Sequence, residues 1–168
     1  MERRRPRQFE GVEGGVIKEP VNAYLATCSP AVKRSLLMGV LTGATWTADR
    51  AHRRRLWGSA RCPYCDDQGA SEDEDHLLWH YAGWDTARGT PRHKISMMLS
   101  RIPSLPGDVK QWPACLRLCG LPLRDLLGSV SLQLIKLFVD TLSDMFSAVL
   151  MARMLVERRE DAMFNRKL

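Results

Sequence analysis

Residues 123–164 read LRDLLGSVSLQLIKLFVDTLSDMFSAVLMARMLVERREDAMF, and this stretch decides the fold class. It contains no proline and one glycine, and its apolar residues recur as they do on a helix that is apolar over most of its circumference. Lys136, Asp140 and Asp144 lie in its most apolar part, where each charge would cost several kcal/mol at the centre of a bilayer. We therefore expect a long amphipathic helix that is covered by protein and does not span a membrane.

The sequence leaves open what covers this helix. It can fold back on the preceding residues, pair with a second copy in a homo-dimer, or dock on a protein partner, and burial in its own fold is the simplest of these. A polar stripe is expected to form one wet edge, and it consists of Ser129, Gln133, Lys136, Asp140, Ser143, Asp144 and Ser147. The candidate partner-binding residues are Leu137, Phe138, Leu142, Met145 and Phe146.

Upstream of this helix, Cys62-Pro-Tyr-Cys65 is followed by an acidic loop and then by His76-Leu-Leu-Trp-His80. Two thiolates that are two residues apart can bind one ion from a tight turn, and two histidines at i and i+4 share one face of an α-helix. The spacing therefore predicts a structural Zn²⁺ ion with Cys62, Cys65, His76 and His80 as its four ligands. The alternative is a pair of free thiols beside a helix with two solvated histidines.

The residues between these ligands favour the zinc interpretation. Ser71 and Glu74 have the spacing of a capping box, with Ser71 as N-cap, directly before the apolar run 77–79. So small a module buries little apolar surface, and metal binding would supply part of its folding free energy. Four protein ligands would leave no open coordination position, which is typical of a structural zinc site.

The order of these motifs resembles the C-terminal zinc-binding region of non-LTR retrotransposon reverse transcriptases. The resemblance covers about residues 35–90, and it rests on Leu41-Thr42-Gly43, Arg50, Cys62, Cys65, His76-Leu77-Leu78, Trp84 and Arg88. It implies a zinc module that descends from a retroelement. The family's last ligand is a cysteine, and this chain has Tyr81 at that position. Either His80 replaces that cysteine or the site has decayed.

Several classes of function are disfavoured. The chain has no Tyr/Phe-x-Asp-Asp polymerase dyad, no glycine-rich phosphate loop and no Ser/His/Asp grouping with a recognisable elbow. With 168 residues it cannot hold a reverse-transcriptase palm beside the zinc module, so we expect a protein that is not an enzyme. Its five cysteines favour a reducing compartment, the cytoplasm or the nucleus, over a disulfide framework.

The net charge of +6 favours an anionic partner, and its distribution is uneven. Residues 66–75 carry six acidic residues and no basic one, whereas the preceding segment is basic. Trp46 and Trp57 flank the basic run, a composition that suits RNA or single-stranded DNA. The alternative is a solvated helix face with both tryptophans in the core. The candidate nucleic-acid-binding residues are Arg50, Arg53, Arg54, Arg55 and Arg61.

The predicted fold is mostly α, a small helical zinc-binding module followed by a long amphipathic C-terminal helix. We expect a disordered basic N-terminus (1–20), a helical zinc-knuckle-like module (21–90), a proline-rich connecting region (91–122) and the long helix (123–168). The predicted function is a non-catalytic nucleic-acid-binding zinc module. The alternatives are a structural or scaffolding subunit that docks through its C-terminal helix, and a retroelement remnant without a selected function.

Overall fold

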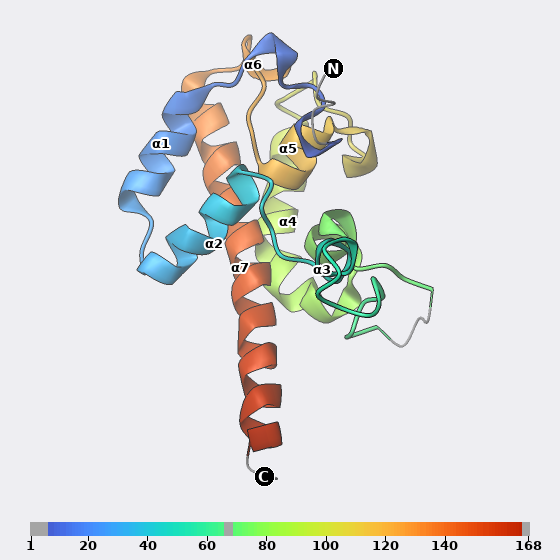
Figure 1. The fold of residues 1–168 in the computed structure, drawn as a ribbon. Coiled ribbons are helices and arrows are strands. Elements are labelled where there is room, and N and C mark those ends of the chain that lie inside the picture. The colour runs from blue at the N-terminus through green and yellow to red at the C-terminus, as the bar shows by residue number, and fades with distance from the viewer. Residues whose placement is uncertain (1–6, 66–68, 166–168) are drawn as a thin grey trace.

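The computed structural model describes residues 7–65 and 69–165, and within these ranges the chain is mostly helical, without a strand (Figure 1). The α-helices are α1 (Lys18–Thr27), α2 (Ala31–Leu41), α3 (Ala48–Arg53), α4 (Asp85–Leu99), α5 (Ala114–Cys119), α6 (Arg124–Leu127) and α7 (Leu132–Asn165). Five short turns complete the fold: η1 (Arg7–Phe9), η2 (Val12–Gly14), η3 (His76–His80), η4 (Ala82–Trp84) and η5 (Val109–Gln111). The predicted fold class, with its long C-terminal helix, is confirmed.

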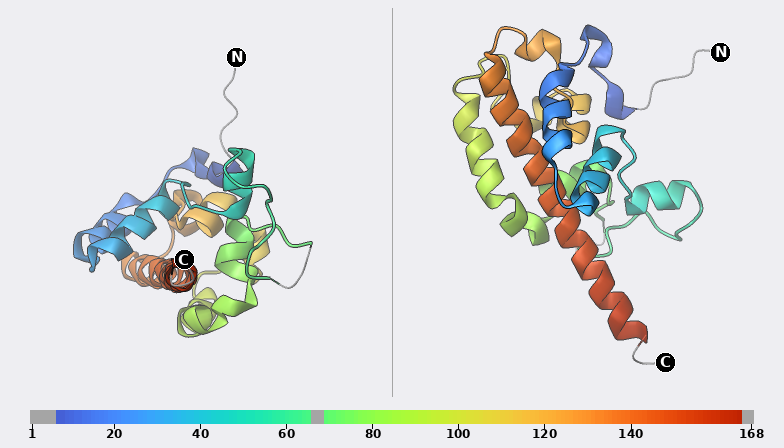
Figure 2. Two further views of the ribbon diagram at one scale, coloured as in Figure 1. Left: turned by 60° about the horizontal axis from the view of Figure 1, so that its bottom comes forward. Right: turned by 90° about the vertical axis from the view of Figure 1, so that its left-hand side faces the viewer.

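Helix α7 is the element around which the others pack (Figures 1 and 2). The helices α1, α2 and α4 all lie against it. Between residues 141 and 150 its side chains are almost all buried, and Asp144 is the one exposed residue there. The chain thus covers its own long helix, as the simplest of the three interpretations requires. No helix among the described residues is long and apolar enough to span a membrane.

An aromatic cluster joins the metal-motif half of the chain to the C-terminal half. The ring of Trp79 lies edge-on to Trp112, with 5.9 Å between centroids, and edge-on to Phe146 at 5.8 Å. The indole nitrogen of Trp79 donates a hydrogen bond to the carbonyl of Arg117 at 2.9 Å. One hydrophobic core therefore runs from Ile17 to Leu150, rather than a separate zinc module and a separate helix.

The expected disorder of residues 1–20 is wrong for the described part, residues 7–20. Ile17 is buried, and its amide donates to the carbonyl of Pro122 at 2.8 Å. The amide of Arg124 donates in return to the carbonyl of Gly15 at 3.0 Å. These backbone bonds fix a polar, glycine-containing segment that has few apolar side chains of its own. Residues 1–6 lie outside the described residues.

Two other predicted boundaries are also corrected. The region 91–122 is not a mere connection, because α4 packs along α7 and Trp112 and Leu116 belong to the core. The long helix does not begin at residue 123, since α6 ends at Leu127 and α7 begins at Leu132. The hydroxyl of Ser131 accepts a hydrogen bond from the amide of Leu134 at 3.4 Å, which caps this new start.

The elements that carry the basic residues begin and end where turn chemistry places them. Helix α2 begins after Pro30, and Gly43 follows its end with a φ of 61°. The hydroxyl of Thr47 accepts from the amide of Arg50 at 3.2 Å and caps α3. Helix α3 then ends at Arg53, and Arg55 has the left-handed φ of 60°. This end turns the following residues out toward solvent.

Candidate functional site

The loop that carries the two cysteines is closed by backbone hydrogen bonds. The amide of Cys62 donates to the carbonyl of Ala70 at 2.9 Å, and that of Glu72 donates to Ala60 at 3.0 Å. Arg61 and Ser71 form an isolated antiparallel bridge between these two bonds. The loop therefore returns on itself, and the Cys62–Cys65 turn lies against the histidine segment.

The histidine segment is η3, a π-helical turn rather than the predicted α-helix. Its i to i+5 hydrogen bond runs from the amide of Tyr81 to the carbonyl of His76 at 2.8 Å. The expected cap at Ser71 is wrong, because the Ser71 hydroxyl donates to the carbonyl of Ala60. Asp73 takes that role instead, since its Oδ1 accepts from the amide of His76 at 2.8 Å.

The structure brings three of the four predicted metal ligands together. The ligand atoms of Cys62, Cys65 and His76 all lie within 4.8 Å of one another. The Sγ of Cys65 is 3.2 Å from the Nε2 of His76, and Cys62 is buried. Two thiols and an imidazole are the donor set that zinc and other soft divalent ions prefer. This Cys/His cluster could hold a metal ion.

His80 does not join this cluster, so the predicted set of four ligands is corrected to three among the described residues. Its Nε2 lies 3.4 Å from the Oδ2 of Asp75, and the same carboxylate accepts from Arg117 Nη1 at 2.5 Å. The prediction assumed an α-helix, in which i and i+4 side chains lie one above the other, and the π-helical turn changes that relation. Tyr81, at the position of the family's cysteine, donates its hydroxyl proton to the carbonyl of Tyr64 at 2.8 Å.

The end of η3 is held by the guanidinium of Arg88, which is 1% exposed. It donates to the backbone carbonyls of Leu78 and Tyr81 and forms an ion pair of 2.7 Å with Asp85. Carbonyls at the end of a helical turn have no partner inside the turn, and a buried cation satisfies them here. Arg88 is thus a positioning residue for the His76 segment.

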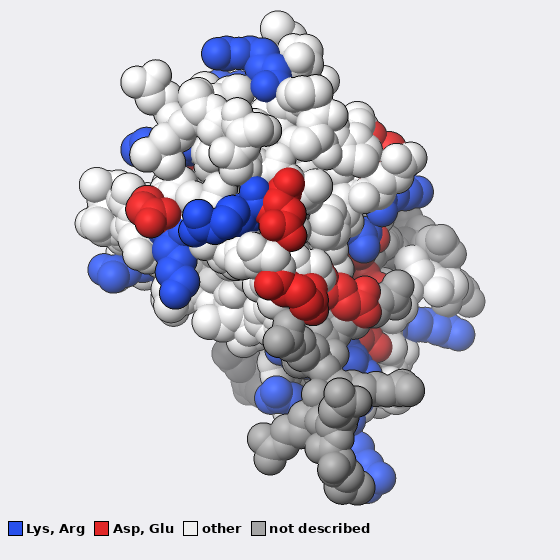
Figure 3. Space-filling view, turned by 90° about the horizontal axis from the view of Figure 1, so that it is seen from above, with Lys and Arg blue, Asp and Glu red and all other residues white. Residues whose placement is uncertain are grey.

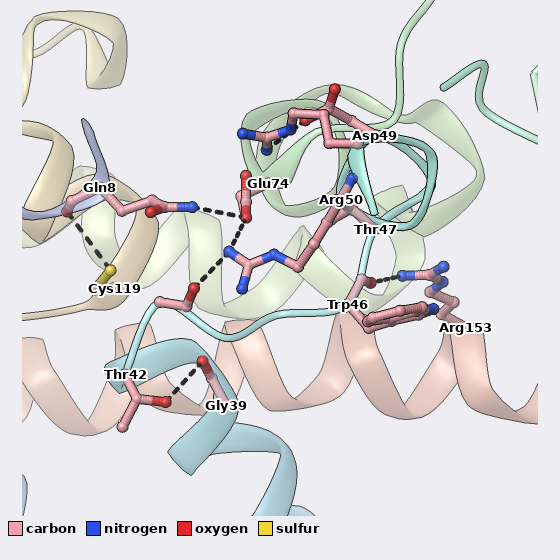
Figure 4. A network of polar contacts seen from close by, with 12 residues as sticks. Gln8, Gly39, Thr42, Trp46, Thr47, Asp49, Arg50, Glu74, Cys119 and Arg153 are labelled. Atoms are coloured by element: carbon pink, nitrogen blue, oxygen red, sulfur yellow. Dashed lines mark hydrogen bonds and ion pairs between the residues drawn. The ribbon is translucent and has the colours of Figure 1, made fainter. Parts of the chain in front are cut away.

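A buried ion pair joins the metal-bearing loop to α7. The Oε2 of Glu72 accepts from the amide of Ala48 at 2.7 Å and lies 3.2 Å from Arg153 Nη2. Arg153 also donates to the carbonyl of Trp46, as Figure 4 shows. Burial raises the pKa of Glu72, and the cation of Arg153 opposes that rise. The sequence did not single out either residue, because Glu72 reads as one of several surface acids before His76.

Arg50 is not a free phosphate-binding residue, contrary to the prediction. Its Nη2 donates to the carbonyl of Gly43 at 2.5 Å and to Glu74 Oε1 at 2.8 Å (Figure 4). Glu74 also accepts from the side-chain Nε2 of Gln8 at 2.9 Å, so the guanidinium is enclosed in an internal network. Arg50 therefore fixes the segment between α2 and α3.

The other predicted nucleic-acid-binding residues, Arg53, Arg54, Arg55 and Arg61, are exposed. Arg53 is in an i, i+4 ion pair with Asp49, at 2.6 Å. The guanidinium of Arg54 lies over the ring of Trp46, with 6.0 Å from its Cζ to the centroid. Trp46 and Trp57 are 42% and 41% exposed, so neither is in the core. We call Trp46, Arg53, Arg54, Arg55 and Trp57 the basic–aromatic surface.

The face of the molecule in Figure 3 carries both basic and acidic residues. Separate lysine and arginine side chains lie around a group of acidic side chains in this view. The net charge of +6 therefore does not make the whole protein a uniform polycation. The distinctive feature of the basic–aromatic surface is the combination of guanidinium groups with exposed indole rings.

Most of the predicted partner-binding residues are unavailable to a partner. Phe138, Leu142, Met145 and Phe146 are fully buried within this chain, whereas Leu137 is 51% exposed. The chain as a whole matches no protein-family model, no curated protein and no solved structure at a significant level.

Proposed function

We propose that this protein is a non-catalytic nucleic-acid-binding module with a structural zinc ion, derived from a retroelement reverse transcriptase. The observation that carries the proposal is the basic–aromatic surface, where two exposed tryptophans flank three exposed arginines in the sequence and the guanidinium of Arg54 lies over the ring of Trp46. Large apolar rings are usually buried, and exposed ones mark binding surfaces when they lie together.

The chemistry of this surface suits a single strand better than a duplex. Unpaired bases offer their faces for stacking on indole rings, and guanidinium groups pair with the phosphates between them. The cap at Thr47 holds the start of α3, and the amides of Arg54 and Arg55 donate to carbonyls of α3, which fixes the turn after it. The arginines are therefore presented from a fixed turn and not from a chain end.

Zinc is the metal proposed for the Cys62, Cys65 and His76 cluster. When bound by two thiolates and an imidazole, it would tie the Cys62–Cys65 turn to η3 and contribute folding free energy. The loop between them is short of apolar side chains, so a metal staple has a clear physical use there. The exposed arginines follow directly from α3, whose first amide is held by Glu72 of this same loop.

The retroelement origin is supported by hydrogen bonds between residues of different motifs. Arg50 donates to the carbonyl of Gly43 in the Leu41-Thr42-Gly43 segment, and Arg88 donates to Leu78 beside the histidine motif. These residues hold the segments around the metal cluster in place. Arg50 and Arg88, two of the residues on which the resemblance rests, thus have a structural role in this chain.

A charge-neutralising triple variant, Arg53→Gln/Arg54→Gln/Arg55→Gln, tests the proposal on a short single-stranded oligonucleotide at several salt concentrations. We expect weaker binding and a smaller slope of log affinity against log salt, by about 0.7 for each lost phosphate contact. The matched control is Arg92→Gln/Lys94→Gln/Arg101→Gln, which removes three exposed charges elsewhere. Equal affinity and slope for the triple variant and the wild type would exclude this surface as the binding site.

One observation favours a scaffolding role as the second candidate. The C-terminal turns of α7 extend beyond the other helices in Figure 1, and Leu155 there is 49% exposed. An exposed leucine on a projecting helix can dock on a protein partner or on a second copy, and the contribution of its apolar contact would depend little on salt. Leu155→Glu would abolish a salt-insensitive association and leave nucleic-acid binding unchanged.

A further inference from the structure

A groove of about 280 Å³ opens between α2 and α7 beside the segment that leads into α3. Its apolar lining residues include Leu36 and Trp46, and its polar ones include Arg153 and Glu157. This volume lies just below the range of about 300–1,000 Å³ that is usual for small-ligand sites. The groove therefore has room for one small planar group and not for a large ligand.

Gly39 keeps this groove open. It lies inside α2 with an ordinary helical φ, where glycine weakens a helix relative to alanine. A Cβ atom at this position would have nothing within 4 Å, so neither backbone strain nor close packing requires glycine. The physical consequence of the missing side chain is free space along the groove wall.

Thr45 supplies a polar group that no described residue uses. Thr45 is one of the residues that line the groove and is 4% exposed, and its buried Oγ1 has no hydrogen-bond partner among the described residues. A buried hydroxyl without a partner is costly, and native structures rarely leave one without reason. The Oγ1 atom itself is almost fully covered, so a ligand atom in the groove would reach it after a rotation of the Thr45 side chain.

Trp46 connects the groove to the basic–aromatic surface. Trp46 lines the groove, and its ring also lies beneath the guanidinium of Arg54. A strand whose phosphates run along Arg53 and Arg54 therefore passes the mouth of the groove. We propose that the groove receives one unstacked base of a bound single strand, which stacks on Trp46 and hydrogen-bonds to Thr45. This inference rests on the proposed nucleic-acid function and names its substrate class.

Charge and hydrogen bonding favour a base over an aromatic side chain of a protein. Phenylalanine offers nothing to the Thr45 hydroxyl, and tyrosine and tryptophan offer one polar group each, whereas every base carries several donors and acceptors on its edge. The exposed arginines beside Trp46 match a phosphate backbone, which accompanies a base and does not accompany a protein side chain. A base held in a duplex would first have to leave its stack, so a single strand is the preferred form.

The test uses the full chain and a short single-stranded DNA with one 2-aminopurine, compared with the same DNA as a duplex. Gly39→Leu fills the groove, and Gly39→Ala is the matched control that adds a methyl group in open space. We expect Gly39→Leu to bind the single strand about tenfold more weakly, as for the loss of one stacked base, with an unchanged salt slope. Gly39→Ala should bind like the wild type. We expect the wild type and Gly39→Ala to quench the 2-aminopurine fluorescence and Gly39→Leu not to quench it.

Thr45→Val provides an independent variant, because it removes the hydroxyl and keeps the shape of the side chain. It should weaken single-strand binding severalfold, and it decides the question if Gly39→Leu does not fold. Suppose that the wild type binds in a salt-dependent way and that folded Gly39→Leu binds equally well. This result would overturn the groove proposal alone and leave the groove for a protein side chain. If Gly39→Leu does not fold, unchanged binding by Thr45→Val would have the same meaning. Absence of any salt-dependent binding by the wild type would overturn both the groove proposal and the proposed function.

Discussion

The guanidinium of Arg153 lies 3.2 Å from the carboxylate of Glu72, and both side chains are buried. The two residues are far apart in the sequence, one in the middle of α7 and the other in the loop before His76. Their contact fixes the metal-bearing loop against the long helix, and Glu72 in turn holds the first amide of α3. The metal cluster and the basic–aromatic surface thus share one structural support.

Removing one partner of this ion pair should destabilise the protein strongly. Arg153→Met would leave Glu72 as an uncompensated buried carboxylate, a change that typically costs about 3–5 kcal/mol. The measurement is the free energy of unfolding in urea, with Arg158→Met as control, because Arg158 is an exposed arginine on the same helix. A loss below about 1 kcal/mol would mean that water reaches Glu72.

The burial of α7 predicts opposite outcomes for two neighbouring leucines. Leu142→Asp places a charge among fully buried side chains and should cost several kcal/mol, enough to unfold a marginally stable domain. Leu137→Asp should be tolerated, because that side chain is 51% exposed. Thermal unfolding of both variants checks this, and equal stability would contradict the packing of α7 seen here.

Periodicity predicted the long helix and its buried face, but not the whole of its polar stripe. Ser143 and Ser147 were expected on a wet edge, and both are buried. The hydroxyl of Ser147 donates to the carbonyl of Ser143 at 2.7 Å, one turn earlier in the helix. Serine can thus satisfy itself inside a helix, and a pattern of polar letters does not distinguish such a residue from a solvated one.

The candidate metal site was predictable only in part, for a related reason. The spacing of Cys62, Cys65 and His76 located three ligands, because short spacings are nearly independent of the rest of the fold. The placement of His80 depends on a π-helical turn and on Asp75, and the enclosure of Arg50 depends on Gln8 and Glu74. Such long-range partners are set by tertiary packing, which local spacing does not contain.

Arg50 should therefore matter for stability before it matters for binding. Arg50→Gln would leave Glu74 without its cation and free the carbonyl of Gly43, a loss of about 1–3 kcal/mol. Chemical denaturation of Arg50→Gln beside the exposed Arg53→Gln measures the difference. If Arg50→Gln binds the oligonucleotide more weakly but has an unchanged free energy of unfolding, Arg50 contacts phosphate as the sequence predicted.

Metal analysis should find one zinc ion per chain. Cys62→Ser, Cys65→Ser and His76→Ala should each lower the zinc content and the melting temperature, because bound metal contributes to folding. His80→Ala is the matched control and should keep its zinc, since His80 pairs with Asp75. Loss of zinc in His80→Ala would show that His80 turns to the metal when the ion is bound.

The two buried cysteines of α5 should be slow to react and should make the fold sensitive to alkali. Burial raises the pKa of Cys119 from 9.0 to about 12, and burial also raises that of Cys115. Because the folded state holds these protons more tightly than the unfolded state, their stabilising effect is complete below about pH 9. It is lost as the pH rises toward 12.

Two measurements check this expectation. The free energy of unfolding should fall between about pH 9 and pH 12, and Cys119→Ala should reduce that fall, whereas Cys28→Ala should not. At neutral pH a thiol reagent should modify the half-buried Cys28 well before Cys115 and Cys119, since the thiolate is the reactive form. Rapid labelling of Cys119 in the native protein would show that α5 opens readily, and the packing of Cys119 against the carbonyl of Gln8 would then not be a stable contact.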